Sequence, residues 1–280
     1  MYQFGFIGMG NMGSAMLKGC LSVFPANTLA FSRKDAAKGE ALSLETGAVW
    51  IDSNRTCAEQ SRYIILAVKP QFYDGVLKEI QPVLDDSRII ISLAPSYSIA
   101  DLKQSLGSSV RIVRAMPNTP AMVGEGMTGL SWSDDDFSES ERTELMQFFT
   151  SFGKAETVPE NLMDAVTAAS GSSPAFIYMM IEALADGVVK YGMPRDKAYT
   201  FVSQAVLGSA KLVLETGEHP VLLKDNVCSP GGITIASVAE LEASGFRSSL
   251  LTVASAVCDR CRNMLSEEWF SHNTALAYPP

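Results

Sequence analysis

Strand-like and helix-like segments alternate along the first 160 residues, and this alternation limits the possible folds more than any other feature of the sequence. Short apolar, β-rich runs occur at 2–7, 28–32, 47–51, 62–68, 88–94 and 110–115. Helical patterns separate the first of these runs, at 12–24 and 34–47. Strands that alternate with helices build a parallel sheet covered on both faces, and the nearly continuous apolar runs at 63–68 and 89–94 fit such burial. The sequence therefore predicts an α/β domain with a parallel sheet over residues 1–160.

The β-rich runs stop after about residue 160, and helical patterns replace them. These patterns cover 173–192, 194–217, 232–245 and 246–265. Pro174 and Pro194 stand at predicted helix starts, where a missing N–H is tolerated, and Gly192, Gly217 and Gly245 stand where helices should end. The first helix is apolar on nearly every side, so a domain of this length can hardly enclose it alone. We expect residues 161–280 to form an all-α domain that associates with another subunit.

Net charge and composition exclude several classes of protein. The 280-residue chain carries a formal net charge of −9, whereas nucleic acids and anionic membranes require basic surfaces. The apolar stretch 165–181 is interrupted by serines and Pro174, so it is not expected to cross a membrane, and the N-terminus lacks the pattern of a signal peptide. Five cysteines are an odd number for a disulfide framework. We therefore expect a cytoplasmic protein that binds neither nucleic acid nor membrane.

A glycine motif connects the first predicted strand to the first predicted helix. The segment "GFIGMGNMGSAM" contains Gly8-x-Gly10-x-x-Gly13. In this context the first glycine makes the turn, the second admits a pyrophosphate and the third packs helix against strand. The phosphates then meet the N–H groups of a helix N-terminus. The motif predicts a dinucleotide-binding domain.

The end of the second predicted strand indicates which dinucleotide is bound. Enzymes that use NAD usually place Asp or Glu there, to bind a ribose hydroxyl. Here the sequence reads Ser32-Arg33-Lys34, a hydroxyl and two cations that suit a 2′-phosphate. The sequence thus predicts NADPH as the cofactor, with NADH as the alternative because Asp35 follows closely.

Further candidate cofactor residues lie after other predicted strands, where this type of sheet binds its ligands. Two such turns are 67–70 and 116–120, which read "AVKP" and "MPNTP". The complete set of predicted cofactor-binding residues is Ile7, Gly8, Gly10, Asn11, Met12, Gly13, Ser32, Arg33, Lys34, Asn54, Ala67, Val68, Lys69, Pro70, Ala94 and Asn118.

Groups suited to acid–base or metal chemistry are scarce in the sequence. His219 precedes a proline in a polar turn, and His272 lies in the C-terminal tail, so neither fits an oriented general base. Cys258 and Cys261 form a single CxxC pair inside a helical pattern, which indicates ordinary helical cysteines and no metal site. Hydride reduction of an already protonated C=N bond fits this composition, because reduction of a ketone normally needs a general acid near the oxygen.

Three segments closely resemble pyrroline-5-carboxylate reductase: "GFIGMGNMGSAMLKG", "DAVTAASGSSPAFIYMM" and "HPVLLKDNVCSPGGITIASVAELEASGFR". The resemblance covers roughly residues 3 to 266. It implies an enzyme that makes proline from its cyclic imine with NAD(P)H. It also implies a Rossmann-type α/β domain followed by an all-α dimerisation domain that interlocks two subunits, in some members as pentamers of dimers.

The resemblance also assigns a purpose to the turn "SPGGIT". The predicted substrate-binding residues are Ser229, Gly231, Gly232, Ile233 and Thr234. Backbone N–H groups at a helix N-terminus can bind the single carboxylate of the imine, and the helix dipole adds to this attraction. In the family the threonine that matches Thr234 lies near the ring nitrogen, so Thr234 is the predicted catalytic residue. The segment 164–175 would form the facing wall of the pocket.

Two positions in these segments depart from the family pattern. The family usually has Ser-Gly-x-Gly-Pro, whereas Ser173 precedes Pro174 here, and Cys228 stands where Ser or Thr is common. These changes concern the fine fit of the substrate and leave the overall match intact.

Three other functions are compatible with parts of the sequence. The glycine motif also resembles the β-hydroxyacid dehydrogenases, but the lysine which those enzymes need is missing from "ASGSSPAFIYMM". A related cyclic-imine reductase and a non-catalytic NADPH-binding sensor are the remaining alternatives. Oxidation of NADPH with the imine, with 2-ketoacids or with neither substrate would distinguish them.

Overall fold

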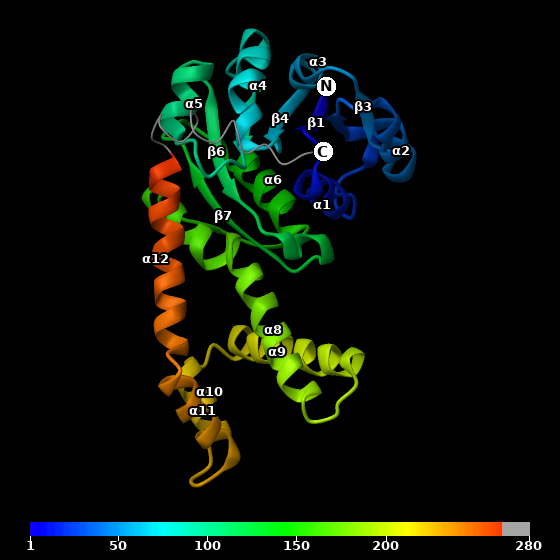
Figure 1. The fold of residues 1–280 in the computed structure, drawn as a ribbon. Helices are drawn as coiled ribbons and strands as arrows, with labels where there is room; N and C mark the ends of the chain where they lie inside the picture. Colours follow the sequence, from blue (N-terminus) through cyan, green and yellow to red (C-terminus); the bar gives the residue numbers. More distant parts are fainter. Residues whose placement is uncertain (265–280) are drawn as a thin grey trace. The chain divides into compact units, whose positions relative to one another are not determined.

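The computed structural model describes residues 1–264, so the end of the helical pattern at 265 and His272 lie outside the described residues. By compactness the chain divides into two units (Figure 1). The sheet unit comprises Met1–Ser172 and the segment that begins at Ala256, and the helical unit comprises Ser173–Ser255. The boundary of functional domains at residues 160 and 161 stays a prediction.

The sheet unit is built on one sheet with the strand order β3-β2-β1-β4-β5-β6-β7-β8. Its strands are β1 (Tyr2–Ile7), β2 (Leu29–Ser32), β3 (Val49–Ile51), β4 (Ser61–Leu66), β5 (Ile89–Ser92), β6 (Arg111–Met116), β7 (Gly126–Trp132) and β8 (Gly153–Thr157). The six predicted strands correspond to β1 to β6, which are parallel to one another. Strand β7 runs antiparallel to β6, and β8 is parallel to β7. The predicted parallel sheet is therefore extended by two strands that were not predicted, β7 and β8, and the first of them is antiparallel to its neighbour β6.

Both faces of this sheet are buried, as the continuous apolar strands predict. Side chains of β4 alternate, since Tyr63 and Ile65 join one core cluster while Ile64 and Leu66 join the other. The first cluster packs against α1 (Asn11–Cys20) and α6 (Glu139–Thr150), and the second against α3 (Asn54–Glu59), α4 (Tyr73–Ile80) and α5 (Ile99–Leu106). The remaining helices are α2 (Ala36–Thr46) and α7 (Met163–Val166), which a π-helical turn at Thr167–Gly171 follows.

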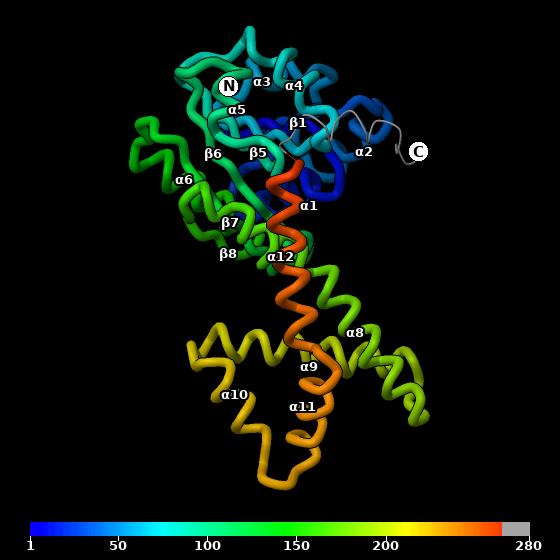
Figure 2. The backbone as a smooth tube through the Cα atoms, turned by 60° about the vertical axis from the view of Figure 1, so that its left-hand side comes forward, coloured from blue at the N-terminus to red at the C-terminus, as the bar shows by residue number. Residues whose placement is uncertain are grey.

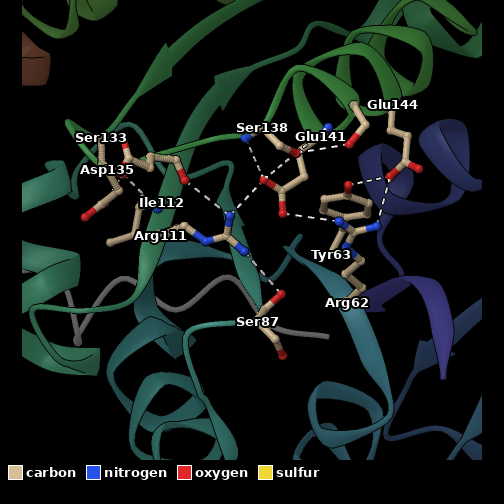
Figure 3. A network of polar contacts seen from close by, with 12 residues as sticks. Arg62, Tyr63, Ser87, Arg111, Ile112, Ser133, Asp135, Ser138, Glu141 and Glu144 are labelled. Carbon is tan, nitrogen blue, oxygen red and sulfur yellow. Dashed lines mark hydrogen bonds and ion pairs between the residues drawn. The ribbon is translucent and has the colours of Figure 1, made fainter.

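A polar network fastens α6 to the sheet (Figure 3). Glu141, in the first turn of α6, accepts hydrogen bonds from Arg111 Nη1 at 2.8 Å and from Arg62 Nη2 at 3.2 Å. The Ser138 backbone N–H donates to the same carboxylate at 2.9 Å, as part of a capping box. Burial would raise the pKa of Glu141, but the Ser138 N–H and the Arg111 guanidinium more than offset it and hold that pKa below its ordinary value.

The helical unit contains α8 (Ser173–Val189), α9 (Arg195–Thr216), α10 (Pro220–Val227) and α11 (Ile233–Ala243), and α12 (Phe246–Met264) leads from it back into the sheet unit. Helices α8 and α9 pack together, as Figure 2 shows. The predicted helix ends are confirmed, because Gly192, Gly217 and Gly245 adopt positive φ angles of 94°, 66° and 77°. Helix α10 was not predicted. Within residues 173–255, all of which the structure describes, only Ala185 and Ala198 are buried.

Among the described helices, none has both the length and the apolar composition that crossing a membrane requires.

Candidate functional site

The glycine motif forms the tight turn between β1 and α1, and each of its glycines has a different reason to be glycine. Gly8 has a φ of +93°, and a Cβ there would lie 2.6 Å from Val68 Cγ1. A Cβ on Gly13 would lie 2.5 Å from the Gly8 carbonyl oxygen. A Cβ on Gly10, in contrast, would meet no atom within 4 Å. The turn is thus closed at Gly8 and Gly13 and open at Gly10, which leaves room for a phosphate to approach the backbone.

The N-terminus of α1 adds a favourable field at this open point. Gly10 is the N-cap residue, no side chain caps the helix, and its first turn holds no acidic residue. The first N–H groups of a helix have no partner within the helix, and they carry the positive end of its dipole. Ile7 ends β1, and Asn11 and Met12 begin α1. The arrangement suits an anion such as a pyrophosphate.

A pocket of about 430 Å³ opens beside this turn, at the carboxyl ends of β1, β2 and β4. Six of the predicted cofactor residues line it: Gly8, Ser32, Arg33, Lys34, Asn54 and Val68. Five lining residues were not predicted: Gln71, Phe72, Gly75, Val76 and Glu79. The latter come from α4 and the short 3-10 turn before it, at Pro70–Phe72. Lys69 is the N-cap of that turn, and Pro70 is its first residue.

Hydrogen bonds fix the basic end of the pocket. Arg33 Nη1 donates to the Met9 carbonyl oxygen at 3.1 Å, which holds the guanidinium beside the glycine turn. The indole N–H of Trp50 donates to the Arg33 carbonyl oxygen at 3.3 Å. Lys34 Nζ lies 5.9 Å from the centroid of the Phe72 ring. Phe72 is 54% exposed, so its ring is accessible to a planar ligand group.

Asp35, the acidic residue that kept NADH open as an alternative, has a structural role here. It is the N-cap of α2, and its carboxylate accepts a hydrogen bond from the Lys38 backbone N–H at 3.1 Å. That hydrogen bond lowers the pKa of Asp35 below its ordinary value. A carboxylate that already caps a helix is less available to a ribose hydroxyl.

Tyr73, on α4, ties together the two strand ends that precede Ala67 and Ala94. Its hydroxyl donates to the Leu66 carbonyl oxygen at 2.8 Å and accepts from the N–H groups of Leu93 and Ala94, both at 3.1 Å. The ring is fully buried, and burial raises the pKa of Tyr73 to about 12. The hydroxyl therefore stays protonated and fixes the backbone at the carboxyl ends of β4 and β5. No signal in the sequence distinguished Tyr73 from an ordinary core tyrosine.

Asn118 lies away from this pocket, and both ends of its side chain are engaged. Its Oδ1 accepts from the Met127 N–H at 2.9 Å, and its Nδ2 donates to the Ser170 carbonyl oxygen at 3.1 Å. Asn118 thus connects the loop after β6 to the start of β7 and to the π-helical turn at Thr167–Gly171. Short π-helical turns are frequent at functional sites.

The predicted substrate-binding turn lies in the helical unit, before α11. The Gly232 N–H donates to the Ser229 carbonyl oxygen at 3.0 Å, and Gly231 between them has a φ of +68°. With Pro230 at its second position this is a type II turn, which requires glycine at the third. A Cβ on Gly232 would lie 2.4 Å from Ser229 Oγ and 3.0 Å from the Ser229 carbonyl oxygen, so a larger residue there would displace the Ser229 side chain.

This turn presents the N-terminus of α11 in the same way that the glycine motif presents α1. Gly232 is the N-cap residue, with no side-chain cap and no acidic residue in the first turn. Ile233 is 89% exposed, and Thr234 is half-buried. The main-chain N–H groups at this point are suited to bind a small carboxylate. All of the predicted substrate residues are thus brought together by one turn.

The remaining titratable candidates have ordinary structural roles. His219 is the N-cap of α10, where its Nδ1 accepts from the Val221 N–H at 3.3 Å. Cys258 and Cys261 are both free thiols, and the Cys258 thiol donates to the Asp164 carbonyl oxygen at 3.7 Å. Within residues 1–264 no group of three or more His, Cys, Asp or Glu side chains could hold a metal ion.

A mostly parallel sheet, with an open glycine turn and a pocket that holds Arg33 and Lys34 at its carboxyl edge, is typical of dinucleotide-dependent oxidoreductases. Family models agree: residues 3–96 match an NADP oxidoreductase, coenzyme F420-dependent, and residues 160–264 match pyrroline-5-carboxylate reductase dimerisation. The chain is 42% identical to pyrroline-5-carboxylate reductase of Escherichia coli (strain K12) over 252 residues, which are 89% of this chain and 93% of that relative. It is 37% identical to pyrroline-5-carboxylate reductase 2 of Homo sapiens over 272 residues, 94% of this chain and 83% of that relative. The chain belongs to the pyrroline-5-carboxylate reductase family.

Solved structures lead to the same family. The pyrroline carboxylate reductase of Plasmodium falciparum, with NADP bound, superposes with a TM-score of 0.85 at 32% identity and covers 95% of this chain and 98% of its own. The pyrroline-5-carboxylate reductase of Coxiella burnetii gives a TM-score of 0.87 at 29% identity, over 95% of this chain and 99% of its own. The predicted family, the fold class and the oxidoreductase class are confirmed, and so is a cofactor of the NAD(P)H type.

Proposed function

We propose that this chain reduces 1-pyrroline-5-carboxylate to L-proline, the last step of proline biosynthesis, with NADPH as the preferred hydride donor. One observation carries the proposal: the type II turn before α11 leaves the N-terminus of that helix without a side-chain cap. This turn lies within residues 160–264, which match the reductase dimerisation family. NADPH supplies the hydride when it is bound. The protein's own residues bind and orient the two partners.

The sheet unit is proposed to hold the dinucleotide. The open backbone at Gly10 and the free N–H groups of α1 suit the pyrophosphate. The 430 Å³ pocket suits the adenosine half, and Arg33 and Lys34 provide the donors for a 2′-phosphate, with Ser32 lining the pocket beside them. Ala94 and the segment 67–70 lie at neighbouring strand ends, where this fold places its ligands.

The helical unit is proposed to hold the imine. The N–H groups at the start of α11 bind the carboxylate, and the Thr234 hydroxyl lies close to the ring nitrogen. An iminium carbon is electrophilic without further activation, so the side chains of this turn position the ring and need not donate a proton during hydride transfer. An uncharged backbone site also suits a chain with a net charge of −9, because it binds an anion without a buried cation.

We further propose that the chain forms a homodimer through its helical unit, with a decamer of five dimers, as in some family members, as the larger alternative assembly. Large apolar side chains of α8 are exposed within one chain, among them Met179 at 67% and Leu184 at 51%. Burial of such surface is the main driving force of association. The cytoplasm is the proposed location, since all five cysteines are free thiols.

Loss of NADPH absorbance on addition of substrate tests the function directly. We expect oxidation with pyrroline-5-carboxylate and none with 2-ketoacids. Oxidation with a different cyclic imine alone would favour the related imine reductase, and oxidation with ketoacids would favour a β-hydroxyacid dehydrogenase. An NADPH-binding protein that is inactive with every imine and ketoacid would be a sensor.

The Thr234→Ala variant tests the imine end of the site. Loss of the hydroxyl removes a polar contact near the ring nitrogen, so kcat/KM for the imine should fall by a factor equivalent to about 1–3 kcal/mol in the barrier. Steady-state kinetics with saturating NADPH measure the loss. Ser237→Ala on the same helix is the matched control, because its hydroxyl donates within the helix to Ile233 O. Unchanged kinetics of Thr234→Ala would remove Thr234 from the site.

The Arg33→Ala variant tests the cofactor end. We expect the KM for NADPH to rise by roughly tenfold, because a charge-assisted contact with the 2′-phosphate is lost, and the KM for NADH to change little. Parallel titrations with the two nicotinamides measure the difference. Arg142→Ala, which removes a guanidinium from α6 that stacks on Trp132, is the control. Equal losses for NADPH and NADH would refute the assignment of the 2′-phosphate.

A further inference from the structure

The dinucleotide pocket contains a carboxylate that arrives from an unexpected element. The second strand ends in a hydroxyl and two cations, but Glu79, in the last turn of α4, lines the same pocket as Ser32, Arg33 and Lys34. The pocket is therefore of mixed charge. In related dinucleotide sites the acidic residue usually follows the second strand. Here that place holds Ser32, Arg33 and Lys34, and the carboxylate of the pocket comes from Glu79 on α4.

Hydrogen bonds fix Glu79 in place. Its Oε2 accepts from Asn54 Nδ2 at 2.9 Å, and its Oε1 accepts from the Arg55 backbone N–H at 3.4 Å. Glu79 itself is exposed, so water can reach its carboxylate. The side chain is thus held at the pocket and remains open to a ligand.

Glu79 also determines which way the Asn54 amide faces. An ionised carboxylate can only accept hydrogen bonds, so it selects the NH₂ end of Asn54. The Oδ1 end is then left for the Ser32 hydroxyl, which donates to it at 2.7 Å. The hydroxyl hydrogen of Ser32 is used within this chain of contacts, and Ser32 and Asn54 are presented to a ligand in one arrangement.

The two nicotinamide cofactors differ at the group that would meet these residues. A 2′-phosphate carries about −1.5 to −2 charges near neutral pH, as other phosphate monoesters do, whereas a 2′-hydroxyl is neutral and can donate a hydrogen bond. Arg33 and Lys34 attract the phosphate. A carboxylate beside it repels the phosphate, but it can accept a hydrogen bond from the hydroxyl of NADH.

We propose that Glu79 is a specificity-determining residue that lowers the preference for NADPH over NADH. The inference rests on the proposed function, because it requires the adenosine half of the cofactor to occupy this pocket. The basic pair makes NADPH the better cofactor, and Glu79 reduces the margin so that NADH is also accepted.

The Glu79→Gln variant isolates the charge. Glutamine keeps an oxygen that can accept from Asn54, so the orientation of the amide is retained while the negative charge is removed. Because Glu79 is exposed and solvent screens it, we expect dissociation constants for NADPH and 2′,5′-ADP to fall by only about threefold. Those for NADH and 5′-AMP should stay the same or rise. Calorimetry with the full-length protein measures all four.

Glu40→Gln is the matched control, because it removes the same charge from an exposed position on α2 that does not line the pocket. A ratio of NADPH to NADH affinity that is unchanged in Glu79→Gln, or that rises equally in Glu40→Gln, would overturn the proposal. An equal weakening of all four ligands would also overturn it, since Glu79 would then only support the structure.

Failure of the proposed function gives a different result. If the wild-type protein binds neither 2′,5′-ADP nor 5′-AMP, the pocket is not the adenosine site and both proposals fall. If the wild type binds the ligands and reduces the imine, and Glu79→Gln matches it in every constant, only the role of Glu79 is lost.

Discussion

The two units of the chain differ in how far their large apolar side chains are buried. In the sheet unit the largest apolar residues, such as Phe4, Tyr63 and Phe148, are fully buried. In the helical unit, Tyr178, Met179 and Leu184 of α8 are 58%, 67% and 51% exposed. The sheet unit encloses a core of its own, whereas the helical unit has a regular secondary structure without an enclosed core. Stability of the first is a property of one chain, and stability of the second should depend on a partner.

The exposed surface of the helical unit contains an apolar groove. The groove lies between α8 and α9 and has a volume of about 390 Å³. Its lining residues are Met180, Leu184, Val188, Val202, Ala205, Val206 and Ser209. A second copy of the chain is the occupant that the match to a dimerisation family favours. Three substitutions test this difference between the units.

The largest effect is expected in the groove. Leu184→Glu places a charge where the second subunit should pack, so dimers should dissociate and activity should be lost. Light scattering coupled to gel filtration measures the mass. Leu44→Glu makes the same change on α2, where the leucine is already 88% exposed, and should leave the assembly intact. A dimeric and active Leu184→Glu protein would show that the groove is not the interface.

The next largest effect is expected in the core of the sheet unit. Phe148 stacks on Phe4 with ring centroids 4.4 Å apart and makes edge contacts with Phe149 and Phe152. Phe148→Ala should lower the free energy of unfolding by about 3–5 kcal/mol, through the lost transfer energy and the cavity left behind. Urea unfolding measures the change. If the sheet unit is stable by itself, the loss should be the same at all protein concentrations, and a concentration-dependent loss would contradict its independence.

The smallest of the three effects concerns the polar network of Figure 3. Glu141→Gln removes a buried charge that Arg111 and Arg62 share, so unfolding at pH 7 should become easier by about 1–3 kcal/mol. The pKa of Glu141 is lowered in the folded state, so its stabilising effect is complete above its unfolded pKa of about 4.3 and is lost as the pH falls through the folded value. The difference between wild type and variant should therefore shrink below about pH 4. If the difference in unfolding free energy between wild type and Glu141→Gln does not change with pH, the charge of Glu141 is not the cause of the stabilisation.

Local sequence patterns were sufficient for the parts of the fold that local physics determines. Strands β1 to β6 and helices α8, α9, α11 and α12 have apolar periodicity and clear ends such as Gly217, and all were predicted. Strands β7 (GMTGLSW) and β8 (GKAET) were not, because neither contains a continuous apolar run like those of β4 and β5. The antiparallel step after β6 depends on pairing between strands and is invisible to such patterns.

The candidate site shows the same division. Residues next to the glycine turn and to the end of β2 were predicted, because the turn fixes its own geometry. Glu79 and Phe72 reach the pocket only because α4 packs on the sheet, and Tyr73 acts only because β4 and β5 are adjacent. The place of Asn118 after β6 was predicted, whereas its two hydrogen bonds depend on contacts with Met127 and Ser170.

Helix α12 begins in the helical unit and continues into the sheet unit at Ala256. The segment 173–255 is therefore an insertion whose two ends are both connected to the sheet unit. Its returning part is anchored, since Cys261 is buried and Arg262 lies 3.8 Å from Asp164. A protease that cuts the loop at Gly192 would therefore produce two pieces that stay together. The fragments 1–192 and 193–280, produced separately, should then reassemble into the folded protein.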